Sequence, residues 1–355
     1  MAVASLPTLD TGGHRPMLAG VGEAKHSSPA EGSIFFRQEI FSWQSVLCLY
    51  FGSLVLAALL VPLLIRLLLL WNLRMPNGII SYLLSRNFGM IFDRVSLLFF
   101  ALMLGVKGFW ACRTAKFWTA IWEGLRRNGG VQIALFWKFF AIGVAMDLGL
   151  MGLQMACFPF TLTPWTPKLA GWALYYGLSA GCIALLEETF FRGCLLGSLL
   201  RPLRERGAIF ASALIFASAH FGASHSSWDL AAEAMTMIDG FRALYEHTLG
   251  VFQNAPPLPL AILFLLGVVL AQLALRHRSL APAMGLHAGL VWMLMLYKKG
   301  VDVVIDSPHP FLGTWRLTDA PATLCILLLM ACCLWRSSRR GEEGDRREGE
   351  SAQVD

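Results

Sequence analysis

Residues 185–193 read Leu-Leu-Glu-Glu-Thr-Phe-Phe-Arg-Gly and place two adjacent carboxylates, Glu187 and Glu188, at the end of a long apolar run. A charged side chain inside a bilayer costs about 2.5 kcal/mol or more, so a chain that keeps two of them there is expected to use them. His220 and His287 lie at comparable positions in later apolar runs. Carboxylates and imidazoles gathered at membrane depth suggest hydrolysis in a place where water is scarce.

The composition predicts a membrane protein. The 355 residues are 56% hydrophobic and 15% charged, whereas soluble domains carry about 25% charged residues. The first apolar run, from about Val46 to Trp71, is too long for a signal-peptide core and is expected to span the membrane. Much of the net charge of +6 lies in short segments beside apolar runs, where cations fix orientation. Nucleic acid is therefore not an expected partner.

The apolar runs predict an all-α fold, a polytopic membrane helix bundle of about eight transmembrane helices. The expected spans are residues 45–71, 95–112, 131–157, 169–190, 207–222, 259–276, 279–297 and 321–335. Basic residues directly after the last span favour a cytoplasmic C-terminus. Eight spans would then place the N-terminus in the cytoplasm as well, with Glu187 and Glu188 at the cytoplasmic end of the fourth span and His220 near the far end of the fifth.

The spacing around the carboxylate pair separates the two acids. Glu188 and Arg192 are four residues apart, with the acid N-terminal to the base, which is the favourable order for an ion pair within a helix. Glu187 is rotated by about 100° around the helix from Glu188, so it faces a different neighbour. We therefore expect Glu188 and Arg192 to neutralise each other, which leaves Glu187 available for chemistry.

One carboxylate and two imidazoles supply the parts of a hydrolytic site. Burial disfavours the charged form of a carboxylate, which makes Glu187 a stronger base toward water. His220 could hold or help to deprotonate that water, and His287 could donate to the oxyanion that forms on the attacked carbonyl. The same side chains would equally suit zinc, although the HExxH signature of helical zinc sites is absent.

The segments Glu187-Glu188-x-x-x-Arg192, Phe216-x-x-x-His220 and His287 resemble the three ordered motifs of the CPBP family, intramembrane endopeptidases related to the type II CAAX prenyl protease. The resemblance covers about residues 170–297, near a third of the chain. It implies an all-helical membrane bundle whose site opens to the cytosol. By the same resemblance, Glu187 is the general base, His220 helps to activate water and His287 contributes to the oxyanion site, with no metal or other cofactor; zinc is possible but not favoured.

The resemblance divides the chain. Residues 169–297 are expected to form a CPBP-like peptidase core and 41–168 N-terminal membrane helices of unassigned role. Residues 298–335 hold a loop and the last transmembrane helix, 1–40 a flexible tail, and 336–355 a disordered charged tail. The expected partners are a membrane-embedded or lipidated peptide or protein, which would be the substrate, and the lipid bilayer.

One position departs from the family pattern. The third motif usually reads HxxxN or HxxxD, whereas Val291 stands four residues after His287. Valine has no polar side-chain atom, and the loss of one oxyanion donor costs about 100- to 1000-fold in rate. Three alternatives follow: another donor substitutes, with the indole of Trp292 or a residue of another helix as candidates; the activity is slow; or the protein is a catalytically impaired membrane scaffold with the same fold.

A transporter is the second alternative function, because Lys107, Lys138 and Asp147 lie in apolar runs outside the resembling segment and intramembrane charges mark ion or proton pathways. Lys138 and Asp147 are nine residues apart, on similar helix faces. A structural pair across helices, or snorkelling of the lysines, is the preferred interpretation. The other histidines, including His247 in the long connection 223–258, are expected in loops and receive no role.

Overall fold

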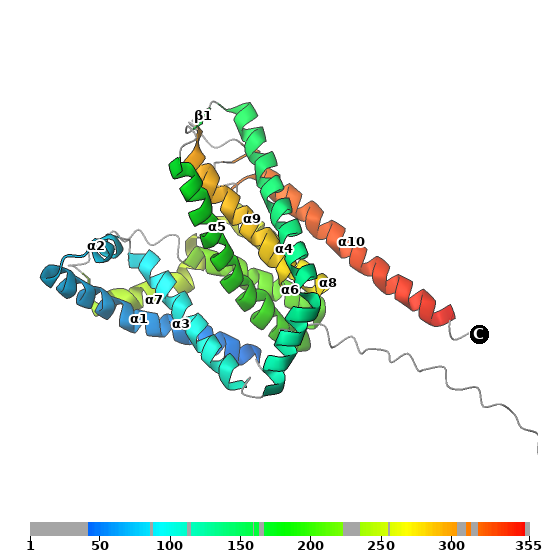
Figure 1. Cartoon of the computed structure of the whole chain (residues 1–355), viewed down its shortest axis with the longest axis horizontal. Coiled ribbons are helices and arrows are strands. Elements are labelled where there is room, and N and C mark those ends of the chain that lie inside the picture. Colours follow the sequence, from blue (N-terminus) through cyan, green and yellow to red (C-terminus); the bar gives the residue numbers. More distant parts are fainter. Residues whose placement is uncertain are drawn as a thin grey trace, which may run out of the picture. The chain divides into compact units, whose positions relative to one another are not determined.

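The structure is a computed structural model, and it describes residues 42–85, 88–111, 115–158, 160–162, 167–222, 235–254, 256–303, 310–313 and 319–351. The predicted N-terminal tail, 1–40, lies outside the described residues. The fold is an all-α helical bundle, as predicted (Figure 1).

The helices in chain order are α1 (Trp43–Arg74), α2 (Gly78–Leu84), α3 (Phe88–Ala111), α4 (Ala115–Cys157), α5 (Pro167–Glu188), the π-helix η3 (Thr189–Leu196), α6 (Gly197–Gly222), α7 (Met237–Asn254), α8 (Pro257–His277), α9 (Ala281–Gly300) and α10 (Pro321–Ser351). Two three-residue strands, β1 (Phe160–Leu162) and β2 (Val301–Val303), pair antiparallel. They join the connection between α4 and α5 to the end of α9.

Four helical segments among the described residues are long and apolar enough to cross a membrane: Trp43–Arg74, Gly129–Cys157, Lys168–Phe221 and Pro257–His277. Three of them correspond to predicted spans, and the apolar helices indicate an integral membrane protein. The predicted count of eight is not established. The predicted fourth and fifth spans lie in one helical segment, and the helix that begins at Pro321 has only a short apolar part, as far as Ser337.

Arg204 marks a kink within α6. Its backbone is non-helical, with φ 56° and ψ 177°, whereas α5, η3 and the start of α6 run on from one another without a break. Glu187 precedes Arg204 by 17 residues and His220 follows it by 16. At 1.5 Å per residue, both positions lie about 25 Å from the kink along their helices. A chain that turns back at Arg204 therefore brings the two residues to the same level.

This reversal corrects the sequence-based placement. We expected Glu187 at the end of the fourth span and His220 near the opposite end of the fifth. Instead, helical structure continues past Glu187 for a further turn and more, so the glutamate lies in the middle of a long helical run. The apolar pattern missed this because the two carboxylates looked like the end of a helix. The turn lies farther along the chain, among Arg201, Arg204 and Arg206.

Small residues bring α9 against α4 in the described bundle (Figure 1). A Cβ built on Gly285 would meet the carbonyl oxygen of Phe136, and one on Gly289 would meet that of Phe140. On the α4 side, a Cβ on Gly143 would lie 2.6 Å from the Leu286 carbonyl oxygen. Such small-xxx-small spacing allows two backbones to approach closely inside a membrane. This contact fixes the helix that carries His287.

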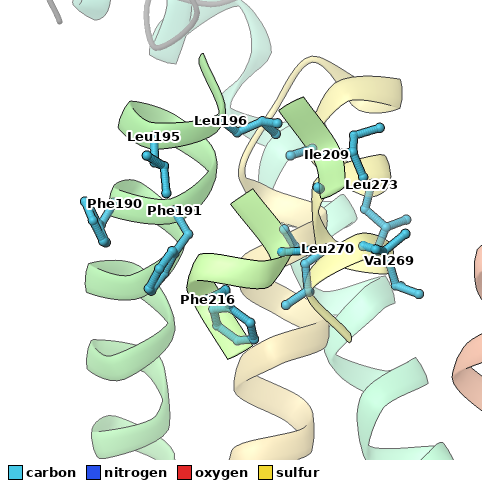
Figure 2. Packing of buried hydrophobic residues seen from close by; sticks show 14 of the residues in the cluster. Phe190, Phe191, Leu195, Leu196, Ile209, Phe216, Val269, Leu270 and Leu273 are labelled. Atoms are coloured by element: carbon cyan, nitrogen blue, oxygen red, sulfur yellow. The ribbon is translucent and has the colours of Figure 1, made fainter. Parts of the chain in front are cut away.

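The largest apolar core lies between η3, α6 and α8. Its buried members include Phe190, Phe191, Leu195 and Leu196 of η3 and, on α6 and α8, Ile209, Phe216, Val269, Leu270 and Leu273. Figure 2 shows Phe191 and Leu196 on the side of η3 toward α6 and α8, and Phe190 on its other side. A Cβ on Gly267 of α8 would lie 2.9 Å from the Cα of Ala213 on α6, so these two helices also touch backbone to backbone. Close packing rather than water exclusion stabilises such contacts in lipid.

Two further regions differ from expectation. The tail predicted to be disordered is helical as far as Ser351, and its sequence places Glu342 four residues before Arg346, a spacing that favours a helix. Lys138 is exposed whereas Asp147 is 6% exposed, so the two do not share an environment on α4. Their predicted similarity of face is therefore wrong, because nine residues rotate an α-helix by two and a half turns and place the two side chains on opposite faces.

Candidate active site

The two carboxylates lie where α5 gives way to the π-helix η3. Glu188 is the residue that precedes η3, and its side chain is fully buried, whereas the side chain of Glu187 is 19% exposed. A π-helix widens the turn and is found frequently at functional sites. The wider turn begins directly after Glu188, so the two acids occupy different environments, as their angular separation predicts.

Glu188 pairs with Arg192 in the arrangement expected from their spacing. Arg192 Nη1 lies 2.9 Å from Glu188 Oε1, and neither side chain is exposed. The guanidinium also donates through Nη2 to the Gly267 carbonyl oxygen at 3.3 Å. Its central carbon lies 4.3 Å from the centre of the Phe216 ring. The cation is thus held by a carboxylate, a backbone carbonyl and an aromatic face.

A third partner of Glu188 was not predicted. Nδ1 of His287 lies 2.8 Å from the same oxygen, Glu188 Oε1, that accepts from Arg192. Because an ionised carboxylate can only accept hydrogen bonds, Nδ1 carries a proton and donates it. The acid that we assigned only to Arg192 therefore also sets the orientation of His287, which is 4% exposed.

His287 lies between the two glycines that pack on α4, but its ring faces the other way. The alternative interpretation of this segment was a small-residue helix contact with an incidental imidazole. The helix contact is present at Gly285 and Gly289. The imidazole is nevertheless engaged, since Nε2 points toward Glu187 Oε2 at 3.9 Å while Nδ1 contacts Glu188.

His220 approaches Glu187 from α6. Its Nε2 lies 3.6 Å from Glu187 Oε2, and its side chain is 30% exposed. Its Nδ1 lies 2.9 Å from the carbonyl oxygen of Phe216, one turn earlier. A carbonyl can only accept, so the Nδ1 proton is directed at Phe216. In the neutral ring, Nε2 is then an acceptor that faces the carboxylate.

The structure brings Glu187, His220 and His287 to one point. Oε2 of Glu187 is within 4 Å of the Nε2 atoms of both histidines and makes no hydrogen bond of its own. Phe216 packs against both rings, with centroid distances of 4.5 Å to His220 and 6.1 Å to His287. These contacts connect residues far apart in the chain, so sequence spacing alone does not specify them.

The indole of Trp292 is not available as a substitute for the polar residue of the third motif. Val291 lies one helical turn after His287 on α9 and is half-buried. The indole N–H of the neighbouring Trp292 donates to the Ala173 carbonyl oxygen at 2.8 Å. The suggestion that Trp292 replaces the missing oxyanion donor is therefore wrong: this N–H ties α9 to α5.

Among the described residues, no group of three or more His, Cys, Asp or Glu side chains has the arrangement of a metal site. Glu187, His220 and His287 offer the donor types that zinc accepts. However, Glu188 and the Phe216 carbonyl hold the Nδ1 atoms of the two rings, so the Nε2 atoms are the imidazole donors that these two rings leave for a ligand. The absence of a cofactor stays a prediction.

The comparisons with known proteins agree with the position of this site. Residues 169–293 match the family model described as type II CAAX prenyl endopeptidase Rce1-like. Neither the curated proteins nor the solved structures gave a match. The matched segment runs from α5 to α9 and contains Glu187, His220 and His287. Residues 169–293 thus form a type II CAAX prenyl endopeptidase Rce1-like domain, in agreement with the predicted resemblance to the CPBP family.

Proposed function

We propose that the protein is an intramembrane endopeptidase that hydrolyses a peptide bond with water activated by Glu187 and His220. The observation that carries this proposal is the convergence of Glu187 Oε2 on the Nε2 atoms of His220 and His287, at 3.6 and 3.9 Å. The family of the matched segment supports a protease of the CAAX type. The Glu/His mechanism, the glutamate-type assignment and the substrate are our own inferences.

The hydrogen-bond pattern defines how water would be held. His220 donates through Nδ1 to Phe216, so its neutral ring offers only an acceptor at Nε2. The carboxylate of Glu187 also offers only acceptors. Two acceptors 3.6 Å apart are best satisfied by a water that donates one hydrogen to each. The lone pairs of that water then point away from both, toward a substrate carbonyl carbon.

The reaction can be written with every proton accounted for. The water oxygen forms a bond to the carbonyl carbon while one of its protons passes to Glu187, and the carbonyl oxygen becomes an oxyanion. The carbon–nitrogen bond then breaks as the same proton moves from Glu187 to the leaving amine. The products are a carboxylic acid and an amine, and Glu187 returns to its starting state.

His287 would stabilise the oxyanion if its ring is protonated at Nε2. Nδ1 is already committed to Glu188, so only the imidazolium presents a second N–H. Glu187, Glu188 and Arg192 together carry a charge of about −1 when all are ionised. A cationic His287 beside them neutralises the cluster, and a buried cluster without net charge is cheaper than one with it. In this proposal Glu188 orients the His287 ring through its contact with Nδ1.

The substrate that fits this setting is a hydrophobic or lipidated peptide segment that reaches the site from the membrane. The family description names a CAAX prenyl endopeptidase, so a prenylated CAAX peptide is the first substrate to test. A multi-pass topology with both termini in the cytoplasm is part of this proposal, as is the absence of a resident metal.

The test is cleavage by purified full-length protein in lipid nanodiscs, with an S-prenylated CAAX peptide and a library of hydrophobic peptides as probes. Wild-type protein is expected to cut at least one probe and to incorporate ¹⁸O from labelled water into the new carboxylate, as mass spectrometry would show. His220→Ala is expected to lower kcat by about 10²- to 10⁴-fold. His277→Ala, at the end of α8, is the matched control. Equal turnover by both variants would rule out the role of His220.

A second candidate function, a non-catalytic scaffold, is favoured by Val291. Replacement of Val291 by asparagine would supply an amide N–H one turn from His287. If the protein is a slow enzyme that lacks one oxyanion donor, we expect Val291→Asn to raise kcat by as much as about 100-fold. Val291→Leu serves as the control for changed bulk. A scaffold that has lost further parts of the site would show no turnover in either variant.

A further inference from the structure

A second polar cluster lies outside the candidate active site, where α1, α3 and α7 each contribute one side chain. The hydroxyl of Tyr50 lies 3.1 Å from Nε2 of His247, and Nδ1 of the same ring lies 3.2 Å from Oδ1 of Asp93. The side chains of His247 and Asp93 are 10% and 25% exposed. Tyr50 and Asp93 precede the segment that matches the family model. His247, expected in a loop, lies within α7.

The cluster has the order carboxylate, imidazole, phenol, and its two links differ. Tyr50 makes a hydrogen bond to His247. Nδ1 of His247 lies close to Asp93, but the geometry of that contact is not that of a hydrogen bond. All three side chains are partly buried, and polar groups that lose part of their hydration cost free energy unless they are paired. Three apolar side chains would fill the same space without that cost, so packing alone does not account for these residues.

The phenol ring of Tyr50 connects this cluster to η3. It stacks on the ring of Phe190 at a centroid distance of 6.0 Å and an angle of 17°. Phe100 of α3 holds the same phenylalanine edge to face at 4.3 Å. Phe190 is the third residue after Glu187 and lies in the first turn of η3. Two of the three helices that form the polar cluster, α1 and α3, therefore also pack against η3 next to the candidate base.

The ring contacts continue from Phe190 to both histidines of the site. Phe190 lies 4.6 Å from Phe191, and Phe191 lies 5.0 Å from Phe216 on α6. Figure 2 shows Phe191 and Phe216 on the facing sides of η3 and α6, with Phe190 on the other side of η3. Phe216 in turn packs against His220 and His287. A continuous series of ring contacts thus runs from His247 to the two imidazoles that face Glu187.

We infer that Asp93, His247 and Tyr50 form a positioning relay for the candidate active site. His247 fixes the orientation of the Tyr50 ring, Tyr50 and Phe100 fix Phe190, and Phe190 sets Phe191 and Phe216, on which the site histidines rest. The relay touches no reacting atom. The effect of the relay on catalysis rests on the proposed function, whereas its effect on the positions of His220 and His287 does not.

The first test reads the site without any substrate. Full-length protein in nanodiscs, labelled with ¹³C and ¹⁵N in its histidine rings, is compared by NMR with single variants, and the His220 and His287 signals are assigned from His220→Gln and His287→Gln. Tyr50→Phe keeps the stacked ring but removes the hydroxyl that reaches His247. It is expected to shift both site signals. Tyr245→Phe makes the same chemical change on α7, where the side chain is 53% exposed, and is expected to leave both in place.

The second test separates positioning from bulk stability by steady-state kinetics on the S-prenylated CAAX peptide or on a library peptide that the wild type cleaves. Tyr50→Phe and His247→Gln are expected to lower kcat by about 10- to 100-fold, the effect of a slightly misplaced catalytic group, with KM close to wild type. Asp93→Asn, at the weaker link, is expected to have a smaller effect. Tyr50→Leu, which also removes the stacked ring, is expected to have a larger one.

The outcomes distinguish this inference from the proposed function. If no probe is cleaved by any form of the protein, the proposed function fails, while the NMR comparison still decides whether the relay positions the histidines. If the wild type cleaves peptide but Tyr50→Phe and His247→Gln leave both the site signals and kcat unchanged, the relay is overturned and the protease stands. Should Tyr50→Phe fail to fold, His247→Gln and Asp93→Asn carry the same comparison.

Discussion

Replacement of Glu187 by glutamine is expected to lower kcat by about 10²- to 10⁴-fold, the usual contribution of a general base. Glutamine has the same shape as glutamate but cannot take a proton from water. Its amide would also place a donor or an uncharged oxygen where Oε2 now lies 3.6 Å from His220 and 3.9 Å from His287. The water would lose one of its two acceptors and its route for the proton.

The same substitution is expected to leave KM and stability close to those of the wild type. Glu187 is partly exposed and its Oε2 makes no hydrogen bond, so a neutral isostere removes no contact that holds the fold. A fall in kcat at constant KM marks an interaction made only in the transition state. This pattern separates a base from a residue that binds substrate.

The measurement is peptide cleavage by the purified variant in nanodiscs, followed by mass spectrometry of the products. Glu205→Gln, an exposed carboxylate on α6, is the matched control and is expected to behave like the wild type. Turnover by Glu187→Gln within a few-fold of wild type would mean that another group activates the water, and the proposed mechanism would have to be abandoned.

Sequence reasoning was most reliable where the relevant contact is local. The pairing of Glu188 with Arg192 follows from a four-residue spacing, and the structure has it at 2.9 Å. The hydrogen bond between Glu188 and His287 joins α5 to α9, and no local pattern predicts it. Spacing reports only local contacts, so it predicted the ion pair of Glu188 with Arg192 and missed the second function of Glu188, which is to orient an imidazole on another helix.

Tertiary contacts explain the other differences. Trp292 was a reasonable candidate donor by chemistry, but packing of α9 on α5 directs its N–H to Ala173. His247 was placed in a loop because its segment lies between predicted spans and is not continuously apolar, whereas contacts with α1 and α3 hold it in a helix. The turn at Arg204 was hidden because hydropathy reports how apolar a segment is, not where it changes direction.

Replacement of Arg192 by methionine is expected to destabilise the protein by about 3–5 kcal/mol, the usual effect of removing one partner of a buried ion pair. The guanidinium is fully buried and contacts Glu188, the Gly267 carbonyl and the face of Phe216. Methionine fills similar space but leaves the carboxylate of Glu188 buried with the His287 ring as its remaining hydrogen-bond donor. The cost of a poorly compensated buried charge, rather than lost packing, dominates the effect.

Two further variants identify that cause. Arg192→Lys keeps the charge but replaces a planar group with several donors by a point charge that cannot bind the carboxylate, the carbonyl and the ring together, so it is expected to restore little stability. Combining Glu188→Gln with Arg192→Met removes the stranded charge and is expected to recover part of the loss, because the two sites are in contact and their effects do not add. Arg206→Met, at an exposed arginine near Trp335, is the control for loss of a cation.

The readout is the apparent free energy of unfolding of the full-length protein in mixed micelles, with histidine NMR on the variants that remain folded. Partial recovery in the double variant would show that charge balance stabilises the site, since packing alone predicts additive losses. If Arg192→Met were as stable as Arg206→Met, the cluster of Arg192, Glu188 and His287 would not be held by ion pairing. The single variant Glu188→Gln keeps Arg192 and removes the charged acceptor of His287, so a shifted His287 signal with lost activity in that variant would assign to Glu188 the role of orienting the ring.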